Sequence, residues 1–175
     1  MCIRDRGKYH FAFNIPENQF EHAVLWLQQY APLLPDHSGE TVFFSEAWNA
    51  HNCYFYDAEG NILELIARHS LVNASSDFSA DSLENISEIG IACDDFAALS
   101  TTLEADIGAR LYQWSGSDSF MPIGDENGLL IIVKPGRIWF PDTGIPALHV
   151  PLHVELENEG HGMCFEYNWS SVDRW

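Results

Sequence analysis

The same order of predicted elements occurs twice in this chain, and that repeat limits the folds the sequence can adopt. In each copy an alternating strand is followed by a helix, two further strands, a turn running from aspartate to glycine, and a last strand. The copies span about residues 9–68 and 86–134. An internal repeat of this length predicts two similar units built side by side. We therefore expect an α+β fold.

The clearest part of the pattern is residues 53–69, where two apolar runs flank the turn 57–60. Its last residue, Gly60, can adopt the left-handed conformation that a bulged hairpin needs. Glu64 is the one charge within the run 62–67, and its strand neighbours on the same face are both isoleucine. A carboxylate in that position must be paired, hydrogen-bonded or metal-bound, because a lone buried charge is too costly.

The rest of the first copy begins with a strand at residues 9–15, in which His10 and Asn14 lie on the face opposite an apolar one. Asn14 predicts a helix N-cap and Pro16 a first helical turn, with the helix continuing to about residue 30. A further strand is predicted at 41–46, ahead of the hairpin.

The second copy starts with a strand at 86–93, in which Glu88 shares its face with a glycine and an alanine. Asp94 or Asp95 caps the helix that follows, which closes near Gly108. Three strands complete this copy, and they are predicted at 110–114, 118–124 and 129–133.

The chain divides into segments of different composition. The first six residues, MCIRDR, resemble a translated sequencing adapter and are excluded from fold reasoning. We then expect a first module at 7–69, a Ser- and Asp-rich linker at 70–85, a second module at 86–134, and an extension at 135–175 with a Pro/Gly loop and strands at 148–156 and 162–168. An adapter at the start also predicts that the true N-terminus, with a further module, is missing.

Charge and cysteine content exclude several classes of function. The formal net charge of −18 argues against nucleic acid or an anionic membrane as a partner, because both would repel the protein. No apolar run reaches the length of a membrane span. The cysteines are scattered without C-x-x-C pairs, which favours a reduced, cytoplasmic protein. Cys53 and Cys93 are predicted to be core residues.

Aligning the two copies on their turns and first strands brings their polar residues into register. His10 corresponds to Glu88. Counted from the glycine of each turn, Glu64 corresponds to Ile132. In both first strands the polar residue shares its face with small ones, which leaves space for a substrate pocket.

The hairpin sequence YFYDAEGNILELI resembles the vicinal oxygen chelate superfamily, which includes glyoxalases, bleomycin- and fosfomycin-resistance proteins and extradiol dioxygenases. The resemblance covers roughly residues 9–134. It implies βαβββ modules that pair into a cupped mixed sheet, with helices outside, around a divalent metal. The family's ligand positions fall on His10, Glu64, Glu88 and Ile132, of which the isoleucine departs from the pattern. One nitrogen and two carboxylates suit iron, manganese, nickel or zinc.

This resemblance implies an enzyme that acts on a small substrate with neighbouring oxygens, in a dioxygenase-like or glyoxalase-like reaction. In the isomerase branch a ligand carboxylate also removes a proton, and Glu88 or Glu64 could do so, with Glu88 as our choice. Ring cleavage would instead require two histidines and one carboxylate. Two alternatives stay open: a metal-free protein that binds small molecules such as antibiotics, with Trp48, Tyr54 and Tyr56 stacking on a planar ligand, or an inactive fragment that lacks its partner module. Such a fragment would favour a homodimer.

Each of the three polar residues also has a purely structural interpretation. Glu64 could be a hydrogen-bonded strand carboxylate, and His10 a pocket histidine without metal. For Glu88 a solvated or salt-bridged glutamate is the favoured interpretation. A rival cluster, His149, His153 and Glu155, would share a strand face, but Pro151 makes that an edge strand and disfavours a metal site there.

Overall fold

The structure is a computed structural model that describes residues 7–158 and 161–167, with side chains placed as far as residue 155. Its first unit comprises β1 (His10–Asn14), α1 (Phe20–Leu27), β2 (Val42–Ser45), β3 (Ala50–Tyr56) and β4 (Ile62–Arg68). The second comprises β5 (Asn85–Ala92), α2 (Phe96–Ile107), β6 (Phe120–Asp125) and β7 (Gly128–Val133), and β8 (Leu152–Asn158) and β9 (His161–Tyr167) follow as a separate hairpin.

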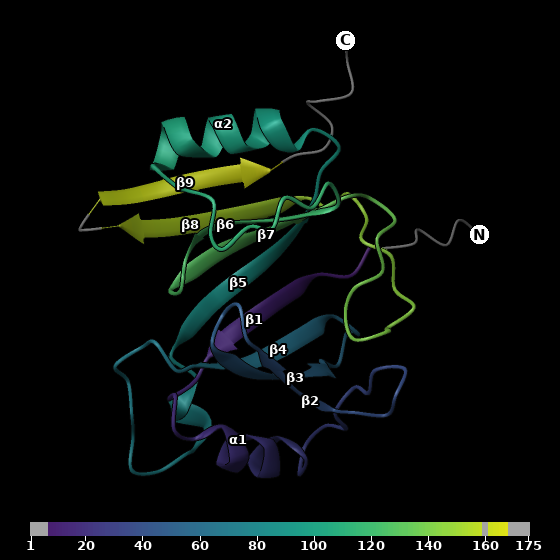
Figure 1. Ribbon diagram of the computed structural model, residues 1–175, viewed down its shortest axis with the longest axis vertical. Coiled ribbons are helices and arrows are strands. Elements are labelled where there is room, and N and C mark those ends of the chain that lie inside the picture. Colours follow the sequence, from purple (N-terminus) through teal and green to yellow (C-terminus); the bar gives the residue numbers. More distant parts are fainter. Residues whose placement is uncertain (1–6, 159–160, 168–175) are drawn as a thin grey trace.

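The strands of both units form one mixed sheet in the order β2-β3-β4-β1-β5-β7-β6. Strand β1 runs parallel to β4 and antiparallel to β5, and β5 runs parallel to β7, so the units join through their first strands. Figure 1 shows this sheet curving between α1 and α2, which lie at opposite ends of the molecule. The expected α+β fold with repeated modules and a cupped mixed sheet is confirmed.

The second unit is less complete than the sequence predicts. Where a strand was expected at 110–114, Leu111 makes only an isolated bridge to Ile123. The strand expected at 118–124 is β6. This unit therefore contributes three strands to the sheet, whereas the first contributes four.

The start of α1 also differs from the prediction, because Asn14 does not cap it. The helix begins at Phe20 after Gln19, whose side chain makes no capping bond. Asn14 ends β1 and is fully buried, and its amide donates to the Glu126 carbonyl oxygen at 2.8 Å. The Asn14 side chain therefore makes a tertiary hydrogen bond on the inner face of the sheet and does not cap the helix as local sequence chemistry had predicted.

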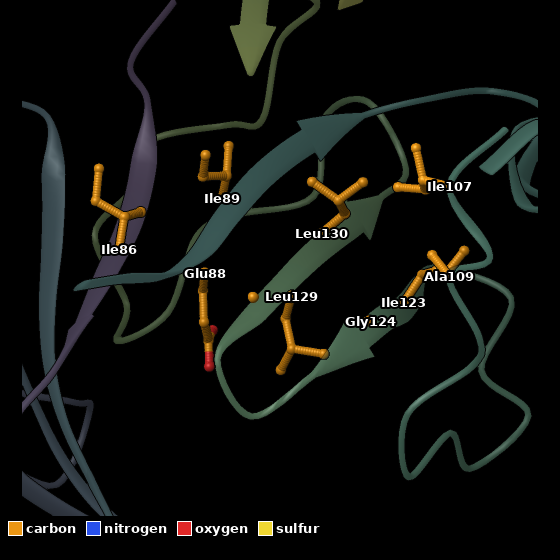
Figure 2. Close-up of a pocket in the computed structure, with 10 residues that line it drawn as sticks. Ile86, Glu88, Ile89, Ile107, Ala109, Ile123, Gly124, Leu129 and Leu130 are labelled. Atoms are coloured by element: carbon orange, nitrogen blue, oxygen red, sulfur yellow. The ribbon is translucent and has the colours of Figure 1, made fainter. Parts of the chain in front are cut away.

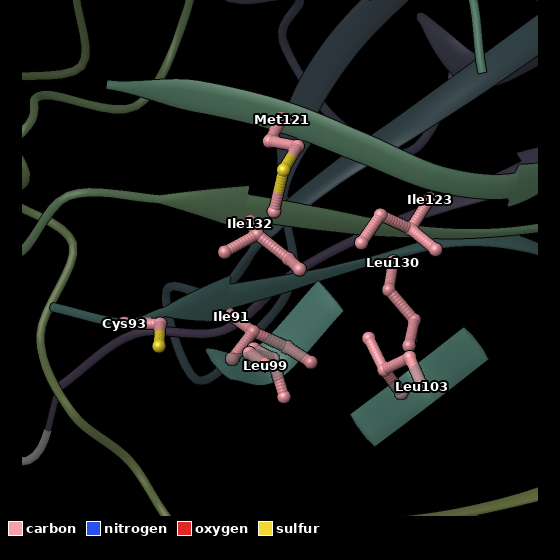
Figure 3. Close-up of a cluster of buried hydrophobic side chains, with 8 residues drawn as sticks. All are labelled: Ile91, Cys93, Leu99, Leu103, Met121, Ile123, Leu130 and Ile132. Carbon is pink, nitrogen blue, oxygen red and sulfur yellow. The ribbon is translucent and has the colours of Figure 1, made fainter. Parts of the chain in front are cut away.

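Helix α2 follows its sequence signals closely. Asp95 Oδ1 accepts a hydrogen bond from the Ala98 amide at 2.9 Å, and Gly108 closes the helix with φ of +64°. Its buried leucines pack on the outer face of the second unit, and Figure 3 shows this cluster, which comprises Ile91, Cys93, Leu99, Leu103, Met121, Ile123, Leu130 and Ile132. Cys93 is a core residue as predicted, and so is Cys53 under α1.

The strand register corrects one correspondence between the units. Glu64 pairs with Ala12 in the first unit, and the residue that pairs with the matching Gly90 in the second unit is Ile131. The predicted residue, Ile132, points to the other face and packs against α2. Counting residues from the glycine of each turn gives the wrong match because the two turns differ by one residue in their distance from the strand pairing. Gly60 lies two residues before Ile62, the partner of His10, whereas Gly128 lies one residue before Leu129, the partner of Glu88.

The segments outside the two units have little regular structure within the described residues. Residues 70–85 contain one 3-10 turn, Ala80–Ser82, and are anchored by Phe78, whose ring centroid lies 5.6 Å from that of Trp26. The strand predicted at 148–156 begins only at Leu152. No helix in the described part of the chain is long and apolar enough to span a bilayer.

Candidate metal centre

Three side chains meet on the inner face of the sheet, where its two units join. His10 comes from β1, Glu64 from β4 and Glu88 from β5, and one ligand atom from each lies within 4.8 Å of the others. All three are buried, with exposed fractions of 6%, 2% and 3% respectively. Residues that are far apart in the sequence and were predicted to be ligands are therefore brought together.

His10 is held by its own neighbouring strand. Its Nδ1 lies 3.3 Å from the Ile62 carbonyl oxygen, which can only accept, so Nδ1 carries the proton. The free electron pair of Nε2 then faces Glu64, whose Oε2 lies 3.7 Å away. Burial lowers the pKa of His10 to about 4, so this imidazole is neutral at pH 7.

Glu64 is held from its other side by β3. Its Oε1 accepts a hydrogen bond of 2.8 Å from the Asn52 amide, which also donates to the Tyr54 hydroxyl at 2.9 Å. The Tyr54 hydroxyl itself bonds to Glu64. Burial, and then the negative charge of Glu88, raise the pKa of Glu64 well above its ordinary value.

A fourth polar side chain of the site is that of Arg68, which the sequence analysis missed. Its side chain is fully buried, forms an ion pair with Glu88, and donates from Nε to Asn14 Oδ1 at 3.3 Å. Its guanidinium carbon lies 5.4 Å from the ring centroid of Trp48. A signal was present in the sequence, because Arg68 is four residues after Glu64 and so lies on the same face of β4.

Burial and the ion pair with Arg68 act on the pKa of Glu88 in opposite directions. Burial raises the pKa of Glu88 to about 7, and Arg68 acts against this rise. The salt-bridged state that we favoured for Glu88 on sequence grounds is therefore present. It does not exclude metal binding, because a carboxylate has two oxygens.

The donor set fits a divalent cation. With His10 neutral, the Nε2 electron pair and the Glu64 carboxylate face each other as two acceptors, which is unfavourable unless a cation lies between them. That cation can be a proton on Glu64 or a metal ion. Two ligands about 2.1 Å from one metal at tetrahedral angles lie about 3.4 Å apart, close to the 3.7 Å between His10 and Glu64.

The loop after β7 covers this site. Trp139 is buried, its ring centroid lies 5.1 Å from that of His10, and its Nε1 has no hydrogen-bond partner among the described residues. A Cβ added to Gly90 would lie 2.4 Å from Trp139, so the glycine makes room for the indole. Phe140 continues the cover, with its ring centroid 5.2 Å from that of Tyr54. Trp139 therefore covers His10, and Phe140 covers Tyr54 beside it.

The other predicted groups do not join the centre. His149 lies ahead of β8, and its Nε2 is 3.1 Å from Asp94, whereas His153 Nε2 is 3.4 Å from Glu155. Among the described side chains, His10, Glu64 and Glu88 form the only cluster of three or more histidine, cysteine, aspartate or glutamate residues with the spacing of metal ligands. The rival cluster of His149, His153 and Glu155 is therefore not assembled.

A small apolar cavity is lined by residues of β5, β6 and β7 and of the end of α2, with Glu88 among them. Figure 2 shows that Glu88 points away from the side on which Ile89 and Ile107 lie. The cavity volume is about 40 Å³, enough for a few water molecules at most. It is not a substrate pocket.

Comparison with known proteins gives structural matches only. Glyoxalase I from Zea mays aligns at 16% identity with a TM-score of 0.41, over 71% of this chain and 43% of its own. Two point variants of that enzyme align at 16% and 14% identity, each with a TM-score of 0.44 over 73% of this chain, and over 44% and 45% of their own length. This chain thus spans less than half the length of those proteins. No protein-family model and no curated protein matches the sequence.

The order and pairing of the strands match the expectation from the hairpin sequence, namely two related units in one curved mixed sheet with a helix packed on the outer face of each. In this fold, His10, Glu64, Glu88 and Ile131 occupy the four positions at which the paired strands of the two units converge on the inner face.

Proposed function

We propose that this protein is a metal-dependent enzyme of the vicinal oxygen chelate type, with His10, Glu64 and Glu88 as ligands of a divalent cation. The observation that carries the proposal is the convergence of their three donor atoms within 4.8 Å in a buried position. A neutral nitrogen and two carboxylates suit Fe, Mn, Ni or Zn. A cytoplasmic location belongs to the same proposal, and the buried positions of Cys53 and Cys93 are compatible with it.

The proposed reaction is a glyoxalase-like proton transfer on a small substrate with neighbouring oxygens. A bound cation would polarise a carbonyl and acidify the adjacent C–H. Glu88 is the proposed base, because its carboxylate is one of the three converging groups and would lie beside the carbon that a bound cation acidifies. Arg68 holds the Glu88 carboxylate in place through their ion pair. Ring cleavage is the less favoured reaction, because the centre contains one histidine and not two.

Metal binding provides the first test. Protein stripped with a chelator and then titrated with Mn²⁺, Ni²⁺ or Zn²⁺ should bind a cation at this centre. His10→Ala and Glu64→Gln should each weaken that binding at least tenfold. The matched controls are His37→Ala and Glu59→Gln, whose side chains are exposed, and they should leave it unchanged. If neither His10→Ala nor Glu64→Gln changes the affinity for the cation or the number of cations bound, the metal proposal is refuted.

The chemical step is tested separately in the metal-loaded protein. An α-hydroxy ketone in D₂O should exchange its α-hydrogen for deuterium, which NMR detects. Glu88→Gln should slow this exchange by about 10²-fold or more, as loss of a general base does. If Glu88→Gln leaves the exchange rate unchanged while metal remains bound, Glu88 is not the base.

A metal-free binding protein is the second candidate function, and the Arg68–Glu88 ion pair favours it. This pair already neutralises one carboxylate, and a protonated Glu64 could donate to His10 Nε2. The inner face would then serve only to hold a small molecule under the aromatic cover. Ligand binding that is unaffected by chelators, in protein that takes up no cation, would support this function over the enzyme.

A further inference from the structure

A second group of histidines lies on the α1 side of the sheet, away from the metal centre. His51 belongs to β3, and its Nδ1 lies 2.7 Å from Nε2 of His69, which follows β4. The other ring nitrogen of His69, Nδ1, lies 3.2 Å from Glu17 Oε2. Because side chains alternate along a strand, His51 points away from the face that carries Asn52 and the centre.

The chemistry of these groups fixes where the protons lie. An ionised Glu17 can only accept, so His69 donates to it from Nδ1. His69 Nε2 is then an acceptor, and His51 must donate to it from Nδ1. The result is a chain from Glu17 through His69 to His51 in which two imidazole nitrogens point at each other.

We propose that His51 Nδ1 and His69 Nε2 form a second binding site for a first-row divalent transition cation such as Zn²⁺. Two imidazole nitrogens bound to one zinc at about 2.0–2.1 Å lie about 3.3 Å apart. The rings therefore need to separate by only about half an ångström. The proton of His51 moves from Nδ1 to Nε2 as the cation binds, so no net proton is released, and water completes the coordination.

Glu17 acts as the positioning residue for this site. A ligating histidine commonly donates its other N–H to a carboxylate, which fixes the ring orientation and makes the ligating nitrogen more basic. The contact between Glu17 and His69 has this form. No contact with the central residues is involved, so the site is independent of the proposed enzyme.

Acidic and aromatic side chains surround His51. Burial and the neighbouring His69 lower the pKa of His51, so its ring is neutral at pH 7 and can ligate. Glu21 adds a negative charge close enough to act on His51. The rings of Phe44 and Phe20 lie 4.7 and 5.4 Å from that of His51 and restrict the approach of water from those sides.

Zinc titration of the His10→Ala variant tests the proposal, because that substitution removes a ligand of the central site. This variant should still bind one zinc. Added His51→Gln or His69→Gln should each weaken binding at least tenfold, and added Glu17→Gln about tenfold or more. Added His37→Gln is the control, because the His37 side chain is 86% exposed, and it should change nothing.

Imidazole ¹⁵N NMR of the otherwise unchanged protein gives a second readout that does not depend on the variants folding. Zinc should shift Nδ1 of His51 and Nε2 of His69 and move the His51 proton to Nε2. The proposal is overturned if zinc leaves Nδ1 of His51 and Nε2 of His69 unshifted, or if the two glutamine variants, folded as judged by circular dichroism, bind zinc as tightly as their parent. Loss of the central site alone leaves this result unaffected.

Discussion

Replacing Arg68 by methionine should destabilise the protein in a way that depends on pH. The substitution keeps the length of the side chain and removes the buried partner of Glu88. In the native protein the pKa of Glu88 is about 7, against 4.5 in the unfolded chain. Because the folded pKa is the higher one, native stability falls as pH rises from 4.5 to 7 and is then constant with respect to this group.

Without Arg68, the pKa of Glu88 should rise above 7, because the group that opposed the effect of burial is gone. The variant then continues to lose stability above pH 7, by about 1.4 kcal/mol for each pH unit. The difference in unfolding free energy between the two proteins should grow above pH 7, by up to about 1.4 kcal/mol for each pH unit, until the pH reaches the pKa of Glu88 in the variant. Below pH 7 Glu88 is neutral in both proteins, and the difference should stay constant.

Guanidinium unfolding at pH 6, 7, 8 and 9, in the presence of a chelator, measures this difference. Arg110→Met is the matched control, since Arg110 is exposed, and its effect should not change with pH. Adding Glu88→Gln to Arg68→Met should remove the part of the pH dependence that is due to Glu88. The reasoning is refuted if Arg68→Met destabilises the protein equally at pH 6 and pH 9.

Two other predictions concern the cover and the fourth ligand position. Gly90→Ala should destabilise the protein by about 1–3 kcal/mol in thermal unfolding, because the new methyl group collides with Trp139. Gly128→Ala, which meets no atom within 4 Å, should cost less than about 0.5 kcal/mol, and equal effects would contradict the close packing at Trp139. Ile131→His should tighten binding of Zn²⁺ at the centre, whereas Ile132→His should only disrupt the α2 core. Tighter zinc binding by the second variant would reverse the register correction.

Local pattern in the sequence was sufficient for much of the fold, whereas the three proposed ligands came from the family resemblance. Alternation along each strand decides which side chains share a face, and the resemblance implied that His10, Glu64 and Glu88 point toward a common metal. Capping chemistry likewise predicted both ends of α2, because these bonds join residues within a few positions of each other. The order of elements in the repeat then indicated the sheet.

The features that local pattern missed all depend on partners distant in the sequence. The Arg68–Glu88 ion pair, the cover by Trp139 and the contact between His51 and His69 join different elements. The assignment of Ile131 in place of Ile132 depends on which residues pair across strands, and a difference of one residue between two turns changes it. The sequence by itself determined which chemical groups lie on the inner face. Only the tertiary structure decided how their charges are paired and what covers them, because Coulomb energy and burial depend on distance in space and not on separation along the chain.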